Sequence, residues 1–423
     1  MGPTSSQNPF RWLLEASPPE RKALLAGGLG WLLDAFDVML YSMVLVHLIE
    51  HFRMSKDTAG LLSALTLIAS AAGGIFFGFL ADRIGRTRAL MASILVYSLA
   101  SGASGLAQTI WQLALFRFLL GLGMGGEWAT GATLVAETWR AEHRGKALAL
   151  MQSSWAIGEG AAAIVAGALL GLGTITFSAS LTLPAWRAVF LVGVLPALIV
   201  FWIRRGVPEP EIWRRQGESS RVPLARLWQP DVRRHGIIAT AMNAAALFAY
   251  WGLFTWIPAY LALPIEQGGR GLGLFLTTLW LVVMGISKWF GYVLFGYVAD
   301  ATGRKRTYAG YLGIAAGLVP VFATATNPDM LLLAGALVAF FGTGHFSGFG
   351  AIASELFPTE IRGTAMGLSY NFGRLFSAAA PYLVGTLALS YGLGLAFVFT
   401  SGGFLLAAAL ALLLPETKGR ELK

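Results

Sequence analysis

The chain has 423 residues, of which 56% are hydrophobic and only 13% are charged. This composition excludes an ordinary water-soluble globule and indicates a membrane protein. The net charge of +9 comes from 31 Lys and Arg residues against 22 Asp and Glu residues, and cysteine is absent, so disulfides, thiolate metal sites and cysteine nucleophiles are excluded.

Long apolar runs, each of about 20 residues or more, predict an all-α membrane protein with twelve transmembrane helices. The first 22 residues contain four prolines and no apolar core, so a cleavable signal peptide is not expected there. The predicted spans of the first half are 23–49, 58–81, 88–108, 110–136, 146–172 and 186–204. Those of the second half are 236–262, 271–299, 307–325, 330–354, 363–389 and 393–414.

A polar and basic segment, 205–235, divides the two sets of spans and predicts a cytoplasmic linker. It would join an N-terminal six-helix bundle, 1–204, to a C-terminal one, 236–423. With both termini in the cytoplasm, 24 of the 31 basic residues fall on the cytoplasmic side, as the usual bias of Lys and Arg requires. Anionic lipid headgroups then explain the positive charge, and no nucleic-acid partner is expected.

Two motifs recur at one constant spacing. GFLADRIGRTR (78–88) returns as GYVADATGRKR (296–306), and ETWRAEHRGKA (137–147) returns as ELFPTEIRGTA (355–365), both with an offset of 218 residues. Two separate motifs in one register indicate a gene duplication with parallel topology.

These motifs resemble those of the major facilitator superfamily. GFLADRIGRTR is similar to its cytoplasmic signature between the second and third spans, and PETKG (415–419) and ETWRAEHRG are similar to elements of its sugar-porter-like branch. The resemblance covers nearly the whole chain and implies two bundles that rock about a central site near the bilayer midplane. It further implies a monomer in the plasma membrane, which is the inner membrane in bacteria.

The repeated loops also predict a cytoplasmic gate on physical grounds. An aspartate near one helix end, with arginines a few residues on, can pair with carboxylates and helix ends across the bundle interface. Determination of topology by loop charge is the alternative, but it would not need matched acids in both halves. The candidate gate residues are Asp82, Arg86, Glu137, Arg144, Asp300, Arg304, Glu355 and Arg362.

Charged residues inside the spans are the most informative feature, because each costs about 2.5 to 3.5 kcal/mol at the bilayer centre and usually faces a polar cavity. All the acids among them lie in the N-terminal half, whereas Lys288 and Arg374 have no intramembrane acid in their own half. A substrate carboxylate or phosphate would satisfy both bases, and arginine can hold a carboxylate with two parallel hydrogen bonds. An ion pair between the halves is the alternative.

Asp34 and Asp37 share one helix face, and two carboxylates so close in a low dielectric should not both ionise easily, as a proton carrier requires. The segment LDAFDVMLY resembles the first-span aspartate pair of the aromatic acid:proton symporters. A hydrogen-bonded structural pair is the alternative. Arg117, Glu127 and Glu159 are further candidates for proton coupling. Arg117 is expected to be a structural or proton-relay partner of an acid, with a substrate ligand as the alternative, and a structural role is the alternative for Glu159.

Polar and aromatic residues near these charges are candidates for the wall of a substrate cavity. Several of the 14 tryptophans must instead anchor at the membrane interface, and a buried neutral histidine is the alternative for His345. The predicted substrate-binding residues are Arg374, Lys288, Asn371, Tyr370, Asn243, Tyr250, Trp251, His345 and Gln152.

The chain has no nucleotide-binding Gly-Lys-Ser/Thr loop and no paired-histidine metal motif, so an enzyme, ATP-driven transport, a metal and a cofactor are not expected. Together with the resemblance, the charges predict proton-coupled symport of a small organic anion. GMGGEWATGATLVAETWRAEHRGKA is similar to the sialate and lactate or pyruvate symporters, and LDAFDV to the aromatic acid branch. The alternatives are a transporter of a neutral sugar or organic cation, and a membrane nutrient sensor that does not transport.

Overall fold

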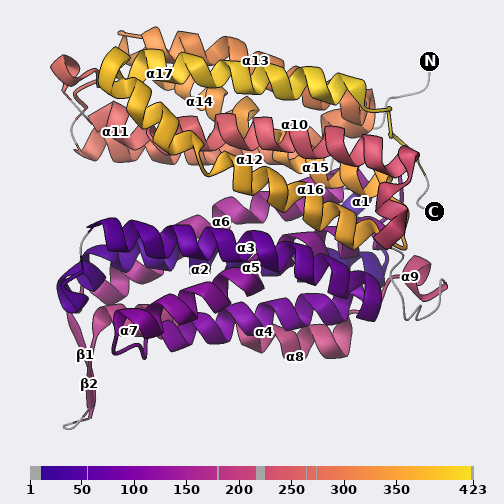
Figure 1. Ribbon diagram of the computed structural model, residues 1–423, viewed down its shortest axis with the longest axis horizontal. Helices are drawn as coiled ribbons and strands as arrows, with labels where there is room; N and C mark the ends of the chain where they lie inside the picture. The colour runs from indigo at the N-terminus through magenta and orange to yellow at the C-terminus, as the bar shows by residue number, and fades with distance from the viewer. Residues whose placement is uncertain are drawn as a thin grey trace.

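The computed structural model describes residues 11–54, 56–178, 181–215, 224–262, 264–272 and 274–420. Most of these residues lie in helices, which form two groups side by side (Figure 1). The first group runs from α2 to α8 and the second from α10 to α17; we call them the N-half and the C-half. The expectation that no signal peptide is present concerns in part residues 1–10, which lie outside the described residues.

The N-half contains α2 (Pro18–Phe52), α3 (Lys56–Ile84), α4 (Arg86–Ser104), α5 (Ile110–Thr138), α6 (Arg144–Leu170), α7 (Ala185–Val192) and α8 (Pro196–Gly206). The C-half contains α10 (Pro230–Phe254), α11 (Ile257–Ala262), η2 (Ile265–Gln267), α12 (Leu274–Thr302), α13 (Arg304–Thr324), α14 (Pro328–Gly344), α15 (Phe346–Leu356), α16 (Arg362–Ser377) and α17 (Ala380–Leu413). Short elements complete the chain: α1 (Arg11–Leu14), β1 (Thr174–Ser178), β2 (Leu181–Pro184), α9 (Glu211–Arg215) and η1 (Leu224–Trp228).

Every predicted span falls on one or two of these helices. Within the described ranges, nine helical stretches are long and apolar enough to cross a membrane. The predicted spans 88–108, 110–136 and 363–389 are not among the nine, because glycine, serine and charged residues lower their hydropathy. The count of twelve is consistent with the helices and stays a prediction.

Several predicted spans are interrupted where the sequence analysis expected one continuous helix. The span 330–354 is divided into α14 and α15 at His345, and the span 186–204 into α7 and α8. The last two predicted spans are separated by Gly392, whose φ of 75° and ψ of 159° are not helical. A positive φ of this kind favours glycine, so this residue marks the turn between them.

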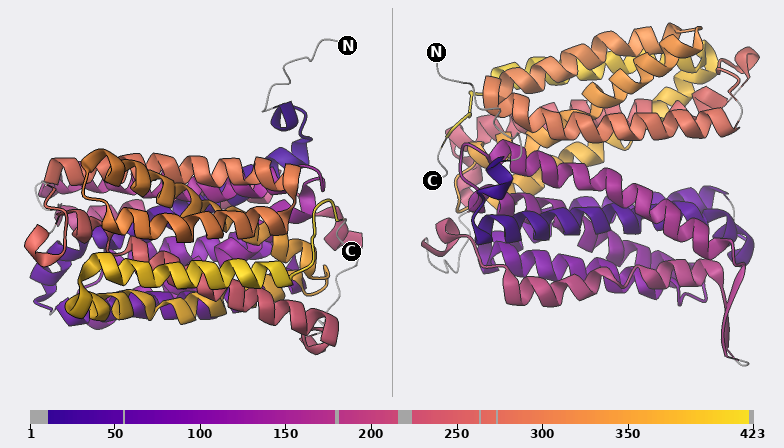
Figure 2. Two further views of the ribbon diagram at one scale, coloured as in Figure 1. Left: turned by 90° about the horizontal axis from the view of Figure 1, so that it is seen from above. Right: turned by 180° about the vertical axis from the view of Figure 1, so that it is seen from behind.

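The two ends of the molecule differ (Figure 1). At the end that we call the terminal end, α3 gives way to α4, α12 gives way to α13, and α9 lies nearby. At the opposite end, the hairpin end, the antiparallel strands β1 and β2 project from the bundle (Figure 2). The sequence analysis predicted no strand here. The signal was the run TITFS with LTLP after it, which is rich in β-branched residues.

The halves meet mainly through two helix pairs, α3 with α16 and α6 with α12; α15 also contacts α5 and α6, and α16 also contacts α5. Glycines allow both pairs to approach closely. A Cβ at Gly78 would lie 2.5 Å from the carbonyl oxygen of Gly363, and a Cβ at Gly296 would lie 2.9 Å from that of Gly145. Gly78 and Gly296 are partners in the 218-residue repeat, as are Gly145 and Gly363. The duplication therefore builds the same contact twice.

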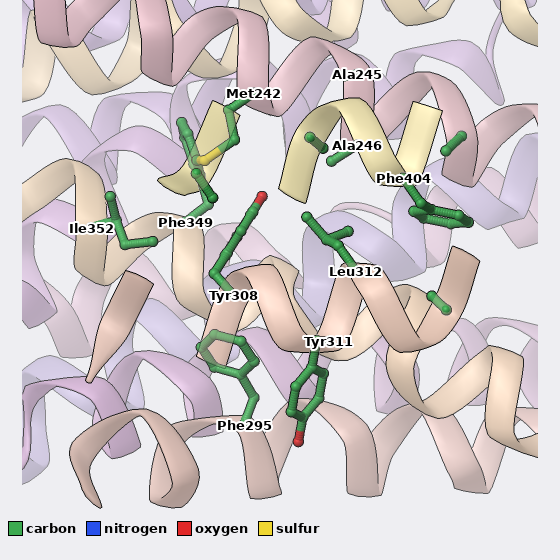
Figure 3. Close-up of a cluster of buried hydrophobic side chains, with 14 of the residues drawn as sticks. Met242, Ala245, Ala246, Phe295, Tyr308, Tyr311, Leu312, Phe349, Ile352 and Phe404 are labelled. Atoms are coloured by element: carbon green, nitrogen blue, oxygen red, sulfur yellow. The ribbon is translucent and has the colours of Figure 1, made fainter. Parts of the chain in front are cut away.

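The core of the C-half is a tightly packed aromatic and aliphatic cluster (Figure 3). Phe295 of α12 packs edge-on against Tyr311 of α13, with ring centroids 4.9 Å apart. Tyr308, Leu312 and Phe349 are fully buried beside them. Because lipid tails are as apolar as these side chains, close packing rather than escape from water holds such helices together.

Gly125 in α5 is a position where we expect a small enlargement to be costly. A Cβ there would lie 1.7 Å from the carbonyl oxygen of Ser70 in α3, so Gly125→Ala must push two backbones apart, a change that typically costs about 1–3 kcal/mol. We expect a clearly lower Tm, followed by the intrinsic fluorescence of the tryptophans. The matched control is Gly167→Ala in α6, whose Cβ would meet nothing within 4 Å. Equal Tm values for the two variants would contradict this close contact.

Candidate functional site

A cavity of about 40 Å³ lies between the halves. The N-half contributes side chains from α2 and α6, and the C-half contributes side chains from α10, α12, α15 and α16. This volume has room for a few water molecules, so an organic molecule would have to displace side chains to enter. The lining residues are Trp31, Gln152, Trp155, Leu247, Tyr250, Trp251, Tyr292, Phe346, Tyr370 and Arg374.

Five of the predicted substrate-binding residues line this cavity: Gln152, Tyr250, Trp251, Tyr370 and Arg374. Their rings and polar groups are fixed by contacts across the interface. Trp128 of the N-half stacks on Tyr370 of the C-half with ring centroids 4.1 Å apart, and its indole N–H donates to Gln152 at 3.1 Å. The sequence analysis therefore found residues from both walls.

Arg374 is the charged member of the cavity wall. Its Nη1 donates to the hydroxyl of Ser70 in the N-half at 3.0 Å, and its guanidinium lies 5.4 Å from the centre of the Tyr370 ring. It also interacts electrostatically with Asp34 across the interface. Among the described residues, no carboxylate lies within 4.0 Å of Arg374 as an ion-pair partner.

The other four predicted substrate-binding residues do not line the cavity. Asn243 donates to the carbonyl oxygen of Tyr370 at 3.2 Å, and Asn371 donates to that of Gly367 at 2.9 Å. His345 is fully buried and packs against aromatic rings. The ammonium of Lys288 lies 4.6 Å from the centre of the Phe254 ring and 5.7 Å from that of Tyr250.

The sequence analysis missed the other lining residues, above all Trp31, Tyr292 and Phe346. Trp31 precedes Asp34 by three residues and Tyr292 follows Lys288 by four. Those are the spacings of one helix face, so the signal was present. Trp31 also packs on Trp155 with ring centroids 4.6 Å apart.

The predicted proton-coupling acids of the N-half are buried together behind the cavity. Asp34, Asp37 and Glu127 are each at most 1% exposed. In the described part of the chain, neither oxygen of Asp34 or of Glu127 has a hydrogen-bond partner. Asp34 and Glu127 also interact with each other electrostatically. Gly30 allows α2 and α5 to approach closely enough for this interaction, because a Cβ at Gly30 would lie 2.3 Å from a carboxylate oxygen of Glu127.

The remaining predicted proton-coupling residues lie on either side of this pair. Asp37 accepts a hydrogen bond of 2.9 Å from Ser101 and interacts electrostatically with Arg117, whose guanidinium lies 4.5 Å from the centre of the Tyr41 ring. Glu159 accepts from the indole N–H of Trp155 at 2.8 Å.

Tyr97 of α4 is a polar neighbour of the buried acids that the sequence analysis missed. It is fully buried, it interacts electrostatically with Asp37, Glu127 and Asp34, and its hydroxyl has no hydrogen-bond partner among the described residues. No spacing in the sequence indicated it, since α4 contains no intramembrane charge.

The predicted gate residues come together at the terminal end in two matching networks. In the first, Asp82 of α3 accepts from the backbone N–H groups of Gly363 and Thr364, at 2.9 and 2.7 Å, and so caps the start of α16. Glu137 accepts from Arg86 at 2.8 and 2.9 Å and from Arg362 of the C-half. Each carboxylate thus receives donors from the other half.

The second network is the same arrangement with the halves exchanged. Asp300 of α12 accepts from the backbone N–H of Lys146 at 3.2 Å, near the start of α6, and from Arg304. Glu355 accepts from Arg304 at 3.4 Å and from Arg144 of the N-half at 3.1 Å. All eight predicted gate residues therefore take part in contacts at the terminal end. A carboxylate at a helix start is favoured by the backbone N–H groups and the helix dipole.

Two further glutamates cap the helices that follow the repeated loops. Glu209 accepts from the backbone N–H groups of Thr87 and Arg88, both at 3.1 Å, and Glu416 accepts from that of Arg304 at 2.8 Å. Burial raises the pKa of the Glu209 carboxyl, and the hydrogen bonds from Thr87 and Arg88 oppose that shift. The sequence analysis noted the PETKG segment of Glu416 without predicting this contact.

The site combines three parts: a cavity with one cation, a buried pair of acids behind it, and a closed set of ion pairs at the terminal end. Among the described residues, the hydrogen bond from Arg374 to Ser70 is the side-chain hydrogen bond between the halves that lies farthest from the terminal end. All the others lie between it and the terminal end. The molecule is therefore closed at the terminal end.

Comparisons with known proteins agree with this architecture. The model of the Major Facilitator Superfamily matches residues 28–287 and 261–423. The chain is 33% identical to the cis,cis-muconate transport protein of Acinetobacter baylyi, over 94% of each chain. It is 29% identical to the sialic acid transporter NanX of Escherichia coli, over 93% of each. These relatives are transporters and not enzymes, and they confirm the predicted resemblance to organic-acid branches.

A solved structure of a proton:xylose symporter, bound to 6-bromo-6-deoxy-D-glucose, shows the same fold. Its TM-score is 0.77, and the match covers 96% of this chain and 98% of that one. The sequences are 20% identical, so this likeness concerns the fold alone. The predicted all-α membrane fold of two helical bundles is confirmed.

The first network predicts the effect of neutralising Glu137. Glu137→Gln leaves Arg86 and Arg362 buried without their shared counter-charge, and breaking a buried pair in this way costs about 3–5 kcal/mol. We expect the terminal end to open more often. Met366 is fully buried and contacts Thr133 across the interface, and the chain has no native cysteine, so Met366→Cys is a single reporter of opening. In the Glu137→Gln background this cysteine should react with a maleimide at least about tenfold faster than in the otherwise unaltered chain.

The matched control for this experiment is Glu142→Gln, because the side chain of Glu142 is 75% exposed in the same loop. It should leave the reaction rate of the Met366→Cys reporter unchanged. Equal rates in the Glu137→Gln and Glu142→Gln backgrounds would show that the network does not hold the terminal end closed.

Proposed function

Because the chain belongs to the Major Facilitator Superfamily, we propose that it is a secondary active transporter that couples proton entry to uptake of a small organic anion. The observation that carries this proposal is Arg374, a cation in the wall of the cavity between the halves with no carboxylate ion-pair partner among the described residues. Arg374 is half-buried, and a cation inside a membrane needs a counter-charge. When Asp34 is protonated, a substrate carboxylate can supply this counter-charge through two hydrogen bonds.

The relatives support an organic acid as the substrate class. Two of them are named as transporters of muconate and of sialic acid, and both match nearly the whole chain. The walls of the cavity fit this class, since aromatic rings surround a single guanidinium. Lys288 adds positive charge next to Tyr250, and Gln152, Tyr370 and Trp251 complete the polar and aromatic contacts. Asn243, Asn371 and His345 act indirectly, by fixing the helices that bear these residues.

Proton coupling rests on the link between Arg374 and the buried acids. Asp34 interacts electrostatically with Arg374 of the C-half and with Glu127 of its own half. Asp34 and Glu127 lack hydrogen-bond donors among the described residues, so at least one of them holds a proton in this state. Protonation of Asp34 leaves the charge of Arg374 free for the anion, and this makes anion binding depend on the proton. Asp37, Arg117 and Glu159 set the electrostatic surroundings.

Transport then follows from alternate closure of the two ends. The halves act as bodies 1–204 and 236–423, joined by the linker 205–235, of which 216–223 lie outside the described residues. Both termini and the terminal end face the cytoplasm, which places the basic loops inside, and the monomer lies in the plasma membrane, the inner membrane in bacteria. An anion at Arg374 together with a proton at Asp34 neutralises the cavity, so the halves can close around it and the terminal networks can separate.

Uptake into proteoliposomes tests this function. The panel is muconate, sialate, benzoate, lactate, glucose and a quaternary amine, each with and without an inward proton gradient. We expect gradient-driven accumulation of at least one carboxylate, since an unneutralised cavity resists closure. Accumulation of glucose or of the amine alone would contradict the anion assignment. Binding of a carboxylate without any uptake would instead indicate a sensor.

Arg374→Gln tests the binding site itself. The substitution removes the charge of the cavity wall, and a hydrogen bond to a charged group contributes about 1.5–3 kcal/mol, so we expect KM for the anion to rise at least about tenfold at a saturating proton concentration. Arg306→Gln is the matched control, because Arg306 is exposed at the terminal end. An unchanged KM in Arg374→Gln would remove Arg374 from the site.

A further inference from the structure

Two apolar grooves open on the outer surface of the molecule, one in each half. The groove of the C-half lies between α10 and α16 and has a volume of about 570 Å³. The groove of the N-half lies between α2 and α6, with Trp289 of α12 from the C-half also lining it, and has a volume of about 480 Å³. Side chains at their rims are well exposed, among them Ile237 (63%) and Phe376 (67%) in the first and Leu25 (52%) and Ile157 (51%) in the second. Neither groove is part of the cavity at Arg374.

The two grooves are copies of one another. α2 begins at Pro18 and α10 at Pro230, and this offset of 212 residues also relates the groove residues of the two helices. The opposite walls follow the 218-residue repeat, since both α6 and α16 begin at its paired arginines. The matching pairs are Arg21 with Arg233, Leu25 with Ile237, Leu29 with Ala241, Leu150 with Leu368, and Ser154 with Phe372.

A short helix closes each groove at the terminal end, just before the first long helix of that half. Leu13 and Leu14 of α1 line the groove of the N-half, and Leu227 and Trp228 of η1 line that of the C-half. Trp228 is 73% exposed. Tryptophan at this position is typical of the membrane interface, so the mouth of the C-half groove lies at headgroup level.

One base lines each groove, and a second base follows it directly in the sequence. They are Arg21 and Lys22 in the first turn of α2, and Arg233 and Arg234 in the first turn of α10, and all four are exposed. Within the described ranges none of them forms an ion pair with a carboxylate. Bases at a helix start oppose the helix dipole. Membrane topology explains the positive charge of these residues, but it does not explain why Arg21 and Arg233 occupy matching positions in the two grooves.

We propose that each groove binds a phospholipid with an anionic headgroup, taken from the leaflet at the terminal end. An acyl chain lies in the groove, along α2 and α6 or along α10 and α16, and the headgroup phosphate contacts the two bases at the mouth. The apolar walls match the chain, and the paired bases supply the charge that recognises the headgroup.

Native mass spectrometry of the full chain, purified in detergent, tests this proposal. The probes are phosphatidylglycerol and phosphatidylcholine with identical chains, added in equal amounts. We expect two molecules of phosphatidylglycerol to be retained in preference to phosphatidylcholine. In the double variant Arg233→Gln, Arg234→Gln, one molecule of phosphatidylglycerol should still be retained, and the affinity for the other should fall at least about tenfold. Arg21→Gln with Lys22→Gln should remove the other. Equal retention of the two lipids by the unaltered chain would overturn the proposal.

Matched controls separate the groove from general surface charge. Arg204→Gln with Arg205→Gln removes two exposed bases at the end of α8, away from both grooves, and should change nothing; an equal loss in this variant would overturn the proposal. Ala241→Trp fills the groove and leaves Arg233 and Arg234 in place. It should release one phosphatidylglycerol, and full retention would show that the bases bind headgroups without the groove, which would also overturn the proposal.

Discussion

The capping of each half's helices by aspartates of the other half is the interaction on which the rest of this structure depends. Asp82 binds the start of α16, and Asp300 binds near the start of α6. A helix start presents backbone N–H groups that have no partner within the helix, so each half completes a helix of the other. Separation of the halves leaves both the carboxylates and these N–H groups without partners at once. Closure of the terminal end is therefore cooperative.

The shared arginines couple the two halves in the same manner. Glu137 is bound by one arginine of its own half and one of the other, and Glu355 repeats this pattern. Buried ion pairs contribute little net stability but are costly to break. Such a network suits a contact that must hold one arrangement firmly and still be exchanged for another, where water can replace the lost partners.

The residues that form the two networks at the terminal end could be predicted from the sequence almost completely, whereas the residues of the cavity could be predicted only in part. Asp82, Glu137 and their repeats belong to short motifs that occur in both halves. The constant spacing of these motifs along the chain already predicts that their residues lie close together. The cavity is assembled from α2, α6, α10, α12, α15 and α16, and its members meet only through packing between distant helices. Charge marked Arg374, but no comparable signal marked Phe346. His345 looked like a ligand residue because it is polar; its place at the break between α14 and α15 turns it into the aromatic core.

The distribution of charge across the interface connects the cavity with the gate. The cation of the C-half faces an acid of the N-half across the cavity, so the attraction between Arg374 and Asp34 itself draws the halves together. Addition of a proton to Asp34 removes that attraction, and addition of an anion at Arg374 restores electroneutrality without it. Either event alone leaves one uncompensated charge in a medium of low dielectric, which is costly. Both events together leave none. The coupling of two solutes would thus follow from the placement of one cation and one acid on opposite halves, with no direct contact between the proton and the anion.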